Sequence, residues 1–133
     1  MTARWAVPVV LAAALLTAAC NGPGAAQASE TARSFEQLAT SDATKACDLL
    51  APKTRDDVEK SAQKSCPEAL GDEDLADPSD LVGVEVYGHD AIARFVNDTV
   101  FLAKFEDGWR VTAASCRPGP SDAKPYECDI SGG

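Results

Sequence analysis

The hydrophobic period of the chain changes at residue 81, and this change constrains the fold more than any other feature of the sequence. From there, apolar side chains recur at every second position in short segments, which is the spacing of half-buried β-strands. The segments are 81–87, 91–96, 99–105 and 109–115, and turn-forming sequences separate them. Connections this short join antiparallel neighbours, so the sequence predicts a four-stranded antiparallel meander.

The segments between the predicted strands, and the tail after the last strand, differ in their turn-forming residues. Glycines in "GHD" (88–90) and "EDG" (106–108) suit tight turns, since glycine tolerates backbone conformations that other residues avoid. "ND" at Asn97 and Asp98 predicts a two-residue hairpin turn of the type with positive φ. The tail after residue 115 contains three prolines, so we expect it to be irregular.

Before residue 81 the apolar period is that of helices. Phe35, Leu38 and Ala39 fall at positions i, i+3 and i+4, and a second stretch between 43 and 50 shows the same spacing. We therefore predict short helices between residues 30 and 71 that cover one face of the sheet. The expected fold class is α+β, with short N-terminal helices packed on the four-stranded sheet in one domain, residues 30–133.

The N-terminal segment predicts export. A short basic start precedes an apolar run at 5–16, and this run is shorter than the roughly 20 residues that a membrane-spanning helix needs. The small residues "TAA" then lead to Cys20, as in a lipobox, although Thr17 stands where leucine is usual. Over residues 1–20 the segment resembles the signal of bacterial lipoproteins. This resemblance implies a signal peptide at 1–19 and diacylglycerol on the Cys20 thiol.

A second cleavage site leaves an alternative open. An ordinary signal peptidase could cut after "AQA" at 26–28 and release a secreted protein without Cys20. With the lipobox, the protein is anchored to the outer face of the cytoplasmic membrane, and residues 20–29 hold the lipidated cysteine and a flexible tether that reaches about 30 Å. The net charge of −9 argues against nucleic-acid partners and against electrostatic adhesion to anionic lipid.

The cysteine count agrees with export. Five cysteines are present, and lipidation of Cys20 leaves an even number. The remaining four allow three pairings, of which sequence order favours two short local bridges. These are Cys47–Cys66 and Cys116–Cys128. A zinc site is a weak alternative, because the chain lacks a C-x-x-C pair and has a single histidine.

Four sequence pieces carry a family resemblance: 47–55 "CDLLAPKTR", 86–88 "VYG", 98–116 with "GWRV", and 125–128 "PYEC". Together with the order of helices and strands, they resemble small lipoproteins of high-GC Gram-positive bacteria and, more broadly, the nuclear transport factor 2-like folds. The resemblance implies an α+β fold and an extracytoplasmic address. It implies no particular activity, since such folds serve enzymes and binding proteins alike.

The search for catalytic chemistry yields little. His89 lies beside Asp90 in a predicted turn, where adjacent side chains usually point into water. The acidic connection at 71–80 does not match the spacing of a calcium-binding loop. The sequence has no nucleophile elbow, phosphate loop or H-E-x-x-H motif. We therefore expect a protein without enzymatic activity and predict no cofactor or metal.

Two binding functions remain as hypotheses. The first is a lipid-anchored module that binds an envelope protein. The alternative is a carrier or sensor for a small hydrophobic ligand, held in a cone between helices and sheet. The candidate residues for such a pocket are the aromatic ones, namely Phe35, Tyr87, Phe101 and Trp109. An apolar cavity that all four border would favour the carrier.

Overall fold

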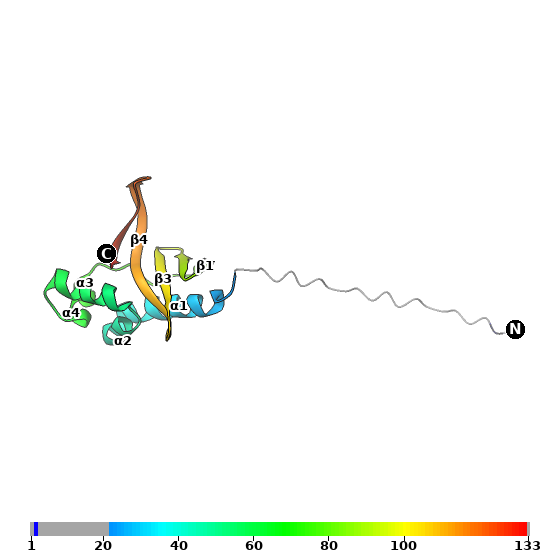
Figure 1. Cartoon of the computed structure of the whole chain (residues 1–133), viewed down its shortest axis with the longest axis horizontal. Helices are drawn as coiled ribbons and strands as arrows, with labels where there is room; N and C mark the ends of the chain where they lie inside the picture. The colour runs from blue at the N-terminus through cyan, green and yellow to red at the C-terminus, as the bar shows by residue number, and fades with distance from the viewer. Residues whose placement is uncertain (1, 3–21, 133) are drawn as a thin grey trace.

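In the computed structural model, which describes Thr2 and residues 22–132, helices come first along the chain and strands follow (Figure 1). The helices are α1 (Ala25–Ser41), α2 (Ala43–Asp48), α3 (Pro52–Ala62) and α4 (Cys66–Asp72). The strands are β1 (Leu81–Tyr87), β2 (Asp90–Phe95), β3 (Thr99–Phe105), β4 (Gly108–Ser121) and β5 (Lys124–Ser131). They form one antiparallel sheet in sequence order. The α+β class is thus confirmed, with five strands in place of the four predicted.

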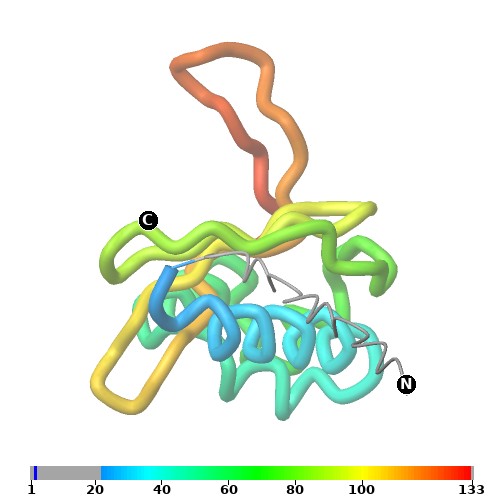
Figure 2. The backbone as a smooth tube through the Cα atoms, turned by 90° about the vertical axis from the view of Figure 1, so that its right-hand side faces the viewer, coloured from blue at the N-terminus to red at the C-terminus, as the bar shows by residue number. Residues whose placement is uncertain are grey.

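The fifth strand corrects the prediction of an irregular tail. β4 continues to Ser121 and the chain returns as β5, forming a ribbon that stands away from the body (Figure 2). We call residues 117–127 the β4–β5 arm. Its prolines are tolerated because part of each strand has no further neighbour, so few ladder hydrogen bonds are lost. Cys116 lies directly opposite Cys128, and their disulfide closes the base of the arm.

Both predicted disulfides are present. Cys47–Cys66 joins α2 to α4, and each cysteine is 1% exposed. Cys116–Cys128 joins β4 to β5. The first bridge fixes the small helices beneath the sheet, and the second fixes the arm to it. Cys20 lies outside the described residues.

The core lies between α1 and the inner face of the sheet. The buried side of α1 consists mainly of small residues, so the helix can approach the strands closely, and Phe35 fills the centre at 1% exposure. Inward-facing residues of β1 to β4 meet it at alternate positions, except in β4, where a register shift against β3 breaks the alternation. They include Val84, Ala93, Val100, Leu102, Val111 and Ala114.

The start of α1 corrects the prediction of a tether over residues 20–29. The helix begins at Ala25, and Ala28 is completely buried. Gly24, with a φ of 84°, leads into the helix and lies so close to Trp109 that an added Cβ would come within 3.2 Å of the indole. The Gly- and Ala-rich composition suggested flexibility, but alanine has the highest helix propensity and its buried side extends the stripe of α1.

Two details of the meander also differ from the prediction. A register shift between Leu81 and Gly83 leaves Val82 72% exposed instead of facing inward. The β2–β3 turn spans three residues, since the Phe95 N–H donates to the Asp98 carbonyl at 2.8 Å. Among the described non-glycine residues, a positive φ occurs at Gln63 and Ser115, so the predicted positive-φ turn at 97–98 is wrong.

The buried start of α1 makes a testable prediction. We expect Ala28→Asp to lower the free energy of unfolding by about 3 kcal/mol, because it places an unpaired charge in the core. Ala26→Asp is the matched control, since Ala26 lies two residues before Ala28 and is exposed. This substitution should change the free energy of unfolding by no more than about 0.5 kcal/mol. Urea unfolding of both variants measures this. Equal stability of the two would mean that residues 25–29 do not pack as a helix.

Candidate functional site

Two buried carboxyl groups, Glu36 of α1 and Asp98 before β3, face each other at the edge of the core. Their residues are 6% and 7% exposed. Glu36 Oε2 and both carboxylate oxygens of Asp98 are buried, and no described donor meets them in good hydrogen-bond geometry. The two groups are close enough to share a hydrogen bond when one carries a proton. Buried carboxyl groups without a basic partner are costly, so this pair is the first candidate for a function.

The fold explains how both side chains reach this position. Glu36 lies four residues after Ala32 and eight after Ala28, on the buried stripe of α1. Asp98 turns inward because the hydrogen bond from Phe95 closes the β2–β3 turn around it. Sequence analysis missed both residues. The four-residue spacing of Ala28, Ala32 and Glu36 could have identified Glu36 had the helix been extended to Ala25. An aspartate in a turn gives no such signal.

Burial controls the protonation of the pair. Burial, together with the charge and hydrogen bond of the neighbouring Asp98, raises the pKa of Glu36 from its ordinary 4.5 to about 8. Burial also raises the pKa of Asp98, while the proximity of the Glu36 carboxyl and of the Ser115 backbone N–H opposes the rise. At neutral pH the Glu36 carboxyl is therefore largely protonated and can donate a hydrogen bond to Asp98.

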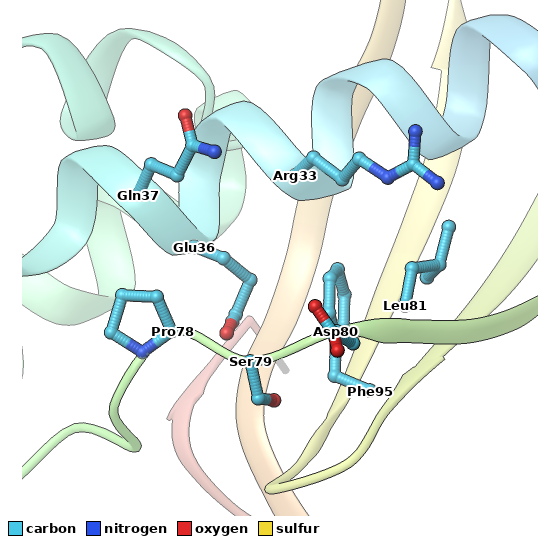
Figure 3. A pocket seen from close by; sticks show the side chains of 8 residues that line it. All are labelled: Arg33, Glu36, Gln37, Pro78, Ser79, Asp80, Leu81 and Phe95. Carbon is cyan, nitrogen blue, oxygen red and sulfur yellow. The ribbon is translucent and has the colours of Figure 1, made fainter.

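The Glu36 side of the pair borders an open pocket of about 700 Å³ (Figure 3). α1 forms one wall and the segment 78–81 the other. That segment is held to the β2–β3 turn, because the Asn97 N–H donates to Ser79 Oγ at 3.0 Å. In the close view the Glu36 carboxyl points toward Ser79, while the Arg33 guanidinium points away from it along the helix. The lining residues are Arg33, Glu36, Gln37, Pro78, Ser79, Asp80, Leu81 and Phe95.

The lining limits the chemistry of this pocket. Charged and amide groups dominate its walls, and a protonated carboxyl can exchange a hydrogen bond or a proton with an entering polar group. A group of three or more His, Cys, Asp or Glu side chains suited to a metal ion is absent from residues 22–132. The pocket is therefore suited to a polar group, not to a hydrophobic ligand.

The four aromatic residues predicted to line an apolar pocket do not come together. Phe35 and Trp109 are buried in the core, at 1% and 6% exposure. Tyr87 is 57% exposed, and Phe101 packs on Tyr126 on the opposite face of the sheet. Strand alternation causes the separation, because Tyr87 and Phe101 stand at outward positions next to inward-facing Val86 and Leu102. The prediction of a shared pocket is wrong.

The outer face of the sheet, away from the helices, carries a second candidate site. Arg94 Nη1 contacts Glu85 Oε1 at 2.7 Å, and Tyr87 Oη donates to Glu85 as well. Phe101 meets Tyr126 edge to face, with ring centroids 4.9 Å apart. Registers place Ile92 between Glu85 and Phe101 in one row. We call Glu85, Ile92, Arg94, Phe101 and Tyr126 the outer-face patch.

His89, the one histidine, is exposed in the turn between β1 and β2. Its carbonyl accepts a hydrogen bond from the Lys104 N–H at 2.7 Å, which ties this turn to the neighbouring strand. The position is that of a turn residue in contact with solvent. We assign no catalytic role to it.

The carboxyl pair predicts how stability depends on pH. Between about 4.5 and about 8 the folded protein keeps a proton that unfolded Glu36 has lost, so stability should fall as the pH rises. One such proton gives a slope of up to about 1.4 kcal/mol per pH unit. Glu36→Gln can still donate a hydrogen bond to Asp98 but does not titrate, so the stability of this variant should fall less steeply as the pH rises. Glu30→Gln is the control, because Glu30 is exposed. Urea unfolding across this pH range measures the slope of stability against pH for each protein. A wild-type slope in both variants would contradict the raised pKa of Glu36.

Comparisons with other proteins give no indication of the function. No family model, no curated protein and no solved structure matches the chain. Within the described residues, no helix combines the length and the apolar character needed to cross a membrane. The resemblance to small lipoproteins thus remains an expectation. The features of the chain that bear on function are the outer-face patch, the carboxyl pair and the disulfides.

Proposed function

We propose that this chain is a lipid-anchored extracytoplasmic module without enzymatic activity that binds an envelope protein through the outer-face patch. The observation that carries the proposal is the one-sided cover of the sheet. Helices pack on the inner face, whereas no described helix covers Ile92, Arg94 and Phe101 on the outer face. There Phe101 is met by the ring of Tyr126 from the β4–β5 arm. An apolar and aromatic surface without a covering layer is a candidate for an interface.

The composition of the patch suits a protein partner. Aromatic residues and arginine are enriched at the centres of protein interfaces, where they supply most of the binding energy. Here Arg94 is held by Glu85, and Tyr126 is held against Phe101, so little side-chain entropy is lost when a partner binds. The disulfide at the base of the β4–β5 arm also holds Tyr126 in place.

The start of α1 supports the lipobox over the second cleavage site. A cut after Ala28 would remove the first turn of α1 together with a completely buried residue of the core. A cut before Cys20 leaves the whole helix in the mature protein. Two buried or strand-pairing disulfides are also typical of an oxidising compartment outside the cytoplasm.

Among the described residues, no observation supports the hypothesis of a carrier for a small hydrophobic ligand. Phe35 and Trp109 fill the space between α1 and the sheet, and Leu38 packs against the same cluster. The pocket beside Glu36 is lined largely by charged and polar groups. We therefore do not propose a carrier function.

The anchor predicts a defined mature product. We expect mass spectrometry of the protein from bacterial membranes to show a chain that begins at a diacylglycerol-modified Cys20. Cys20→Ser should lose the lipid and move from the membrane fraction to the soluble fraction, since lipobox processing requires the thiol. A native protein that is soluble and starts at Ser29 would disprove the anchor.

The outer-face patch predicts which surface captures a partner. We expect Arg94→Ala combined with Tyr126→Ala to lose a protein that the wild type retains after cross-linking in intact membranes and detergent extraction. Arg55→Ala is the matched control, because Arg55 also forms ion pairs and its side chain is 42% exposed, against 40% for Arg94. Partner recovery that is equal in all three proteins would count against the patch.

A further inference from the structure

Two turns lie at one end of the sheet and each presents an exposed aromatic ring. The β1–β2 turn at 88–89 and the β3–β4 turn at 106–107 share this end, because alternate connections of an antiparallel meander do so. Tyr87 at the first turn is 57% exposed, and Phe105 at the second is 40% exposed. Core formation does not account for these two rings, since neither belongs to the buried cluster.

The described chain enters the domain at this same end. A Cβ added to Gly22 would lie 3.8 Å from Val86 Cβ, next to Tyr87, and Gly24 lies against Trp109, next to the second turn. In Figure 2 the beginning of α1 and both turns are on the left of the view, while the β4–β5 arm stands at the top. The entry point and the two aromatic turns thus form one side of the molecule.

Chain length then places the anchor close to this side. Two peptide units separate Cys20 from Gly22, and they span at most about 7 Å. A diacylglycerol on Cys20 would lie inside the bilayer, so Gly22 would lie within about one headgroup layer of it. The connection between the lipid and the domain is therefore short, because residues 25–29 belong to α1 and do not extend it.

We propose that the turns at 88–89 and 106–107 rest on the lipid surface, with Tyr87 and Phe105 in the interfacial layer. This inference rests on the lipid anchor of the proposed function and adds the face that meets the membrane. Tyrosine prefers the membrane–water interface, where its apolar ring and its polar hydroxyl are both accommodated. Phe105 adds an apolar ring of the kind that enters the boundary between headgroups and acyl chains. A diacyl anchor alone secures attachment, and the two rings would set the orientation.

The charges at this end permit the contact. Lys104 and Arg110 lie beside the turns, and Arg110 forms an ion pair with Asp107. Asp90 and Glu106 are further acidic groups at the turns, and Asp48 and Asp56 lie with Arg55 beside Phe105. Three basic groups thus stand against five acidic ones, so this end carries a small part of the net charge of −9. Most of the excess of acidic side chains lies elsewhere, where repulsion from anionic lipid does not oppose the contact.

Tryptophan substitutions at three exposed positions test the inference in the full lipidated chain. Tyr87→Trp and Phe105→Trp report on the two turns. Val96→Trp is the matched control, because Val96 is 68% exposed in the β2–β3 turn at the opposite end of the sheet. Each protein is reconstituted in vesicles of phosphatidylcholine and phosphatidylglycerol whose acyl chains carry bromine, which quenches tryptophan on contact.

We expect bromine to quench the fluorescence of Tyr87→Trp and Phe105→Trp strongly, and that of Val96→Trp no more than the buried Trp109 of the parent protein. Equal quenching of all three variants, or of none, in a protein whose mass shows lipid on Cys20 would overturn the orientation and leave the anchor intact. A mass without lipid on Cys20 would overturn both proposals. Thermal unfolding checks that each variant is folded.

Discussion

The packing of α1 on the inner face of the sheet is the interaction on which the rest of the structure depends. Alanines on the buried side of the helix bring it close to the strands, and Phe35 fills the centre of the contact. Without this helix the apolar inner face would be left to the short helices, which the Cys47–Cys66 bridge ties to one another. A sheet that is apolar on one face must bury that face against another element, so α1 completes the domain.

The same packing creates the buried carboxyl pair. Once Ala28, Ala32 and Phe35 face the sheet, helical geometry directs Glu36 toward the β2–β3 turn, where Asp98 lies. Two buried carboxylates would repel each other at about neutral pH, and their buried oxygens Glu36 Oε2, Asp98 Oδ1 and Asp98 Oδ2 form no hydrogen bond to a described basic side chain. Sharing a proton removes one charge and supplies a donor to the other group. The pair is tolerated because it is protonated, and its cost grows as the proton is lost.

Local patterns in the sequence predicted the parts of the fold that local interactions determine. The alternation from residue 81 identified four strands, since the period of two is visible within each segment. The fifth strand escaped prediction because β4 and β5 pair through a long ribbon rich in proline, which a disulfide between Cys116 and Cys128 stabilises. The start of α1 escaped prediction because "GAAQAS" suits a linker and a helix equally, and only its contact with Trp109 and the sheet distinguishes them.

The candidate site was harder to predict than the fold, for a related reason. Phe35, Tyr87, Phe101 and Trp109 were grouped by residue type, but strand alternation places Tyr87 and Phe101 on the face opposite the core. That separation has a functional consequence. A single sheet with helices on one side offers an uncovered face for a partner and a separate end for the membrane, and the chain enters at that end through Gly22 and Gly24. A short connection to a lipid would hold the end with Tyr87 and Phe105 near the bilayer and leave Arg94 and Tyr126 on the outer face accessible. Substitutions at Phe105 and at Arg94 should therefore separate membrane orientation from partner binding, whereas Tyr87 contributes to both surfaces because its hydroxyl donates to Glu85 of the outer-face patch.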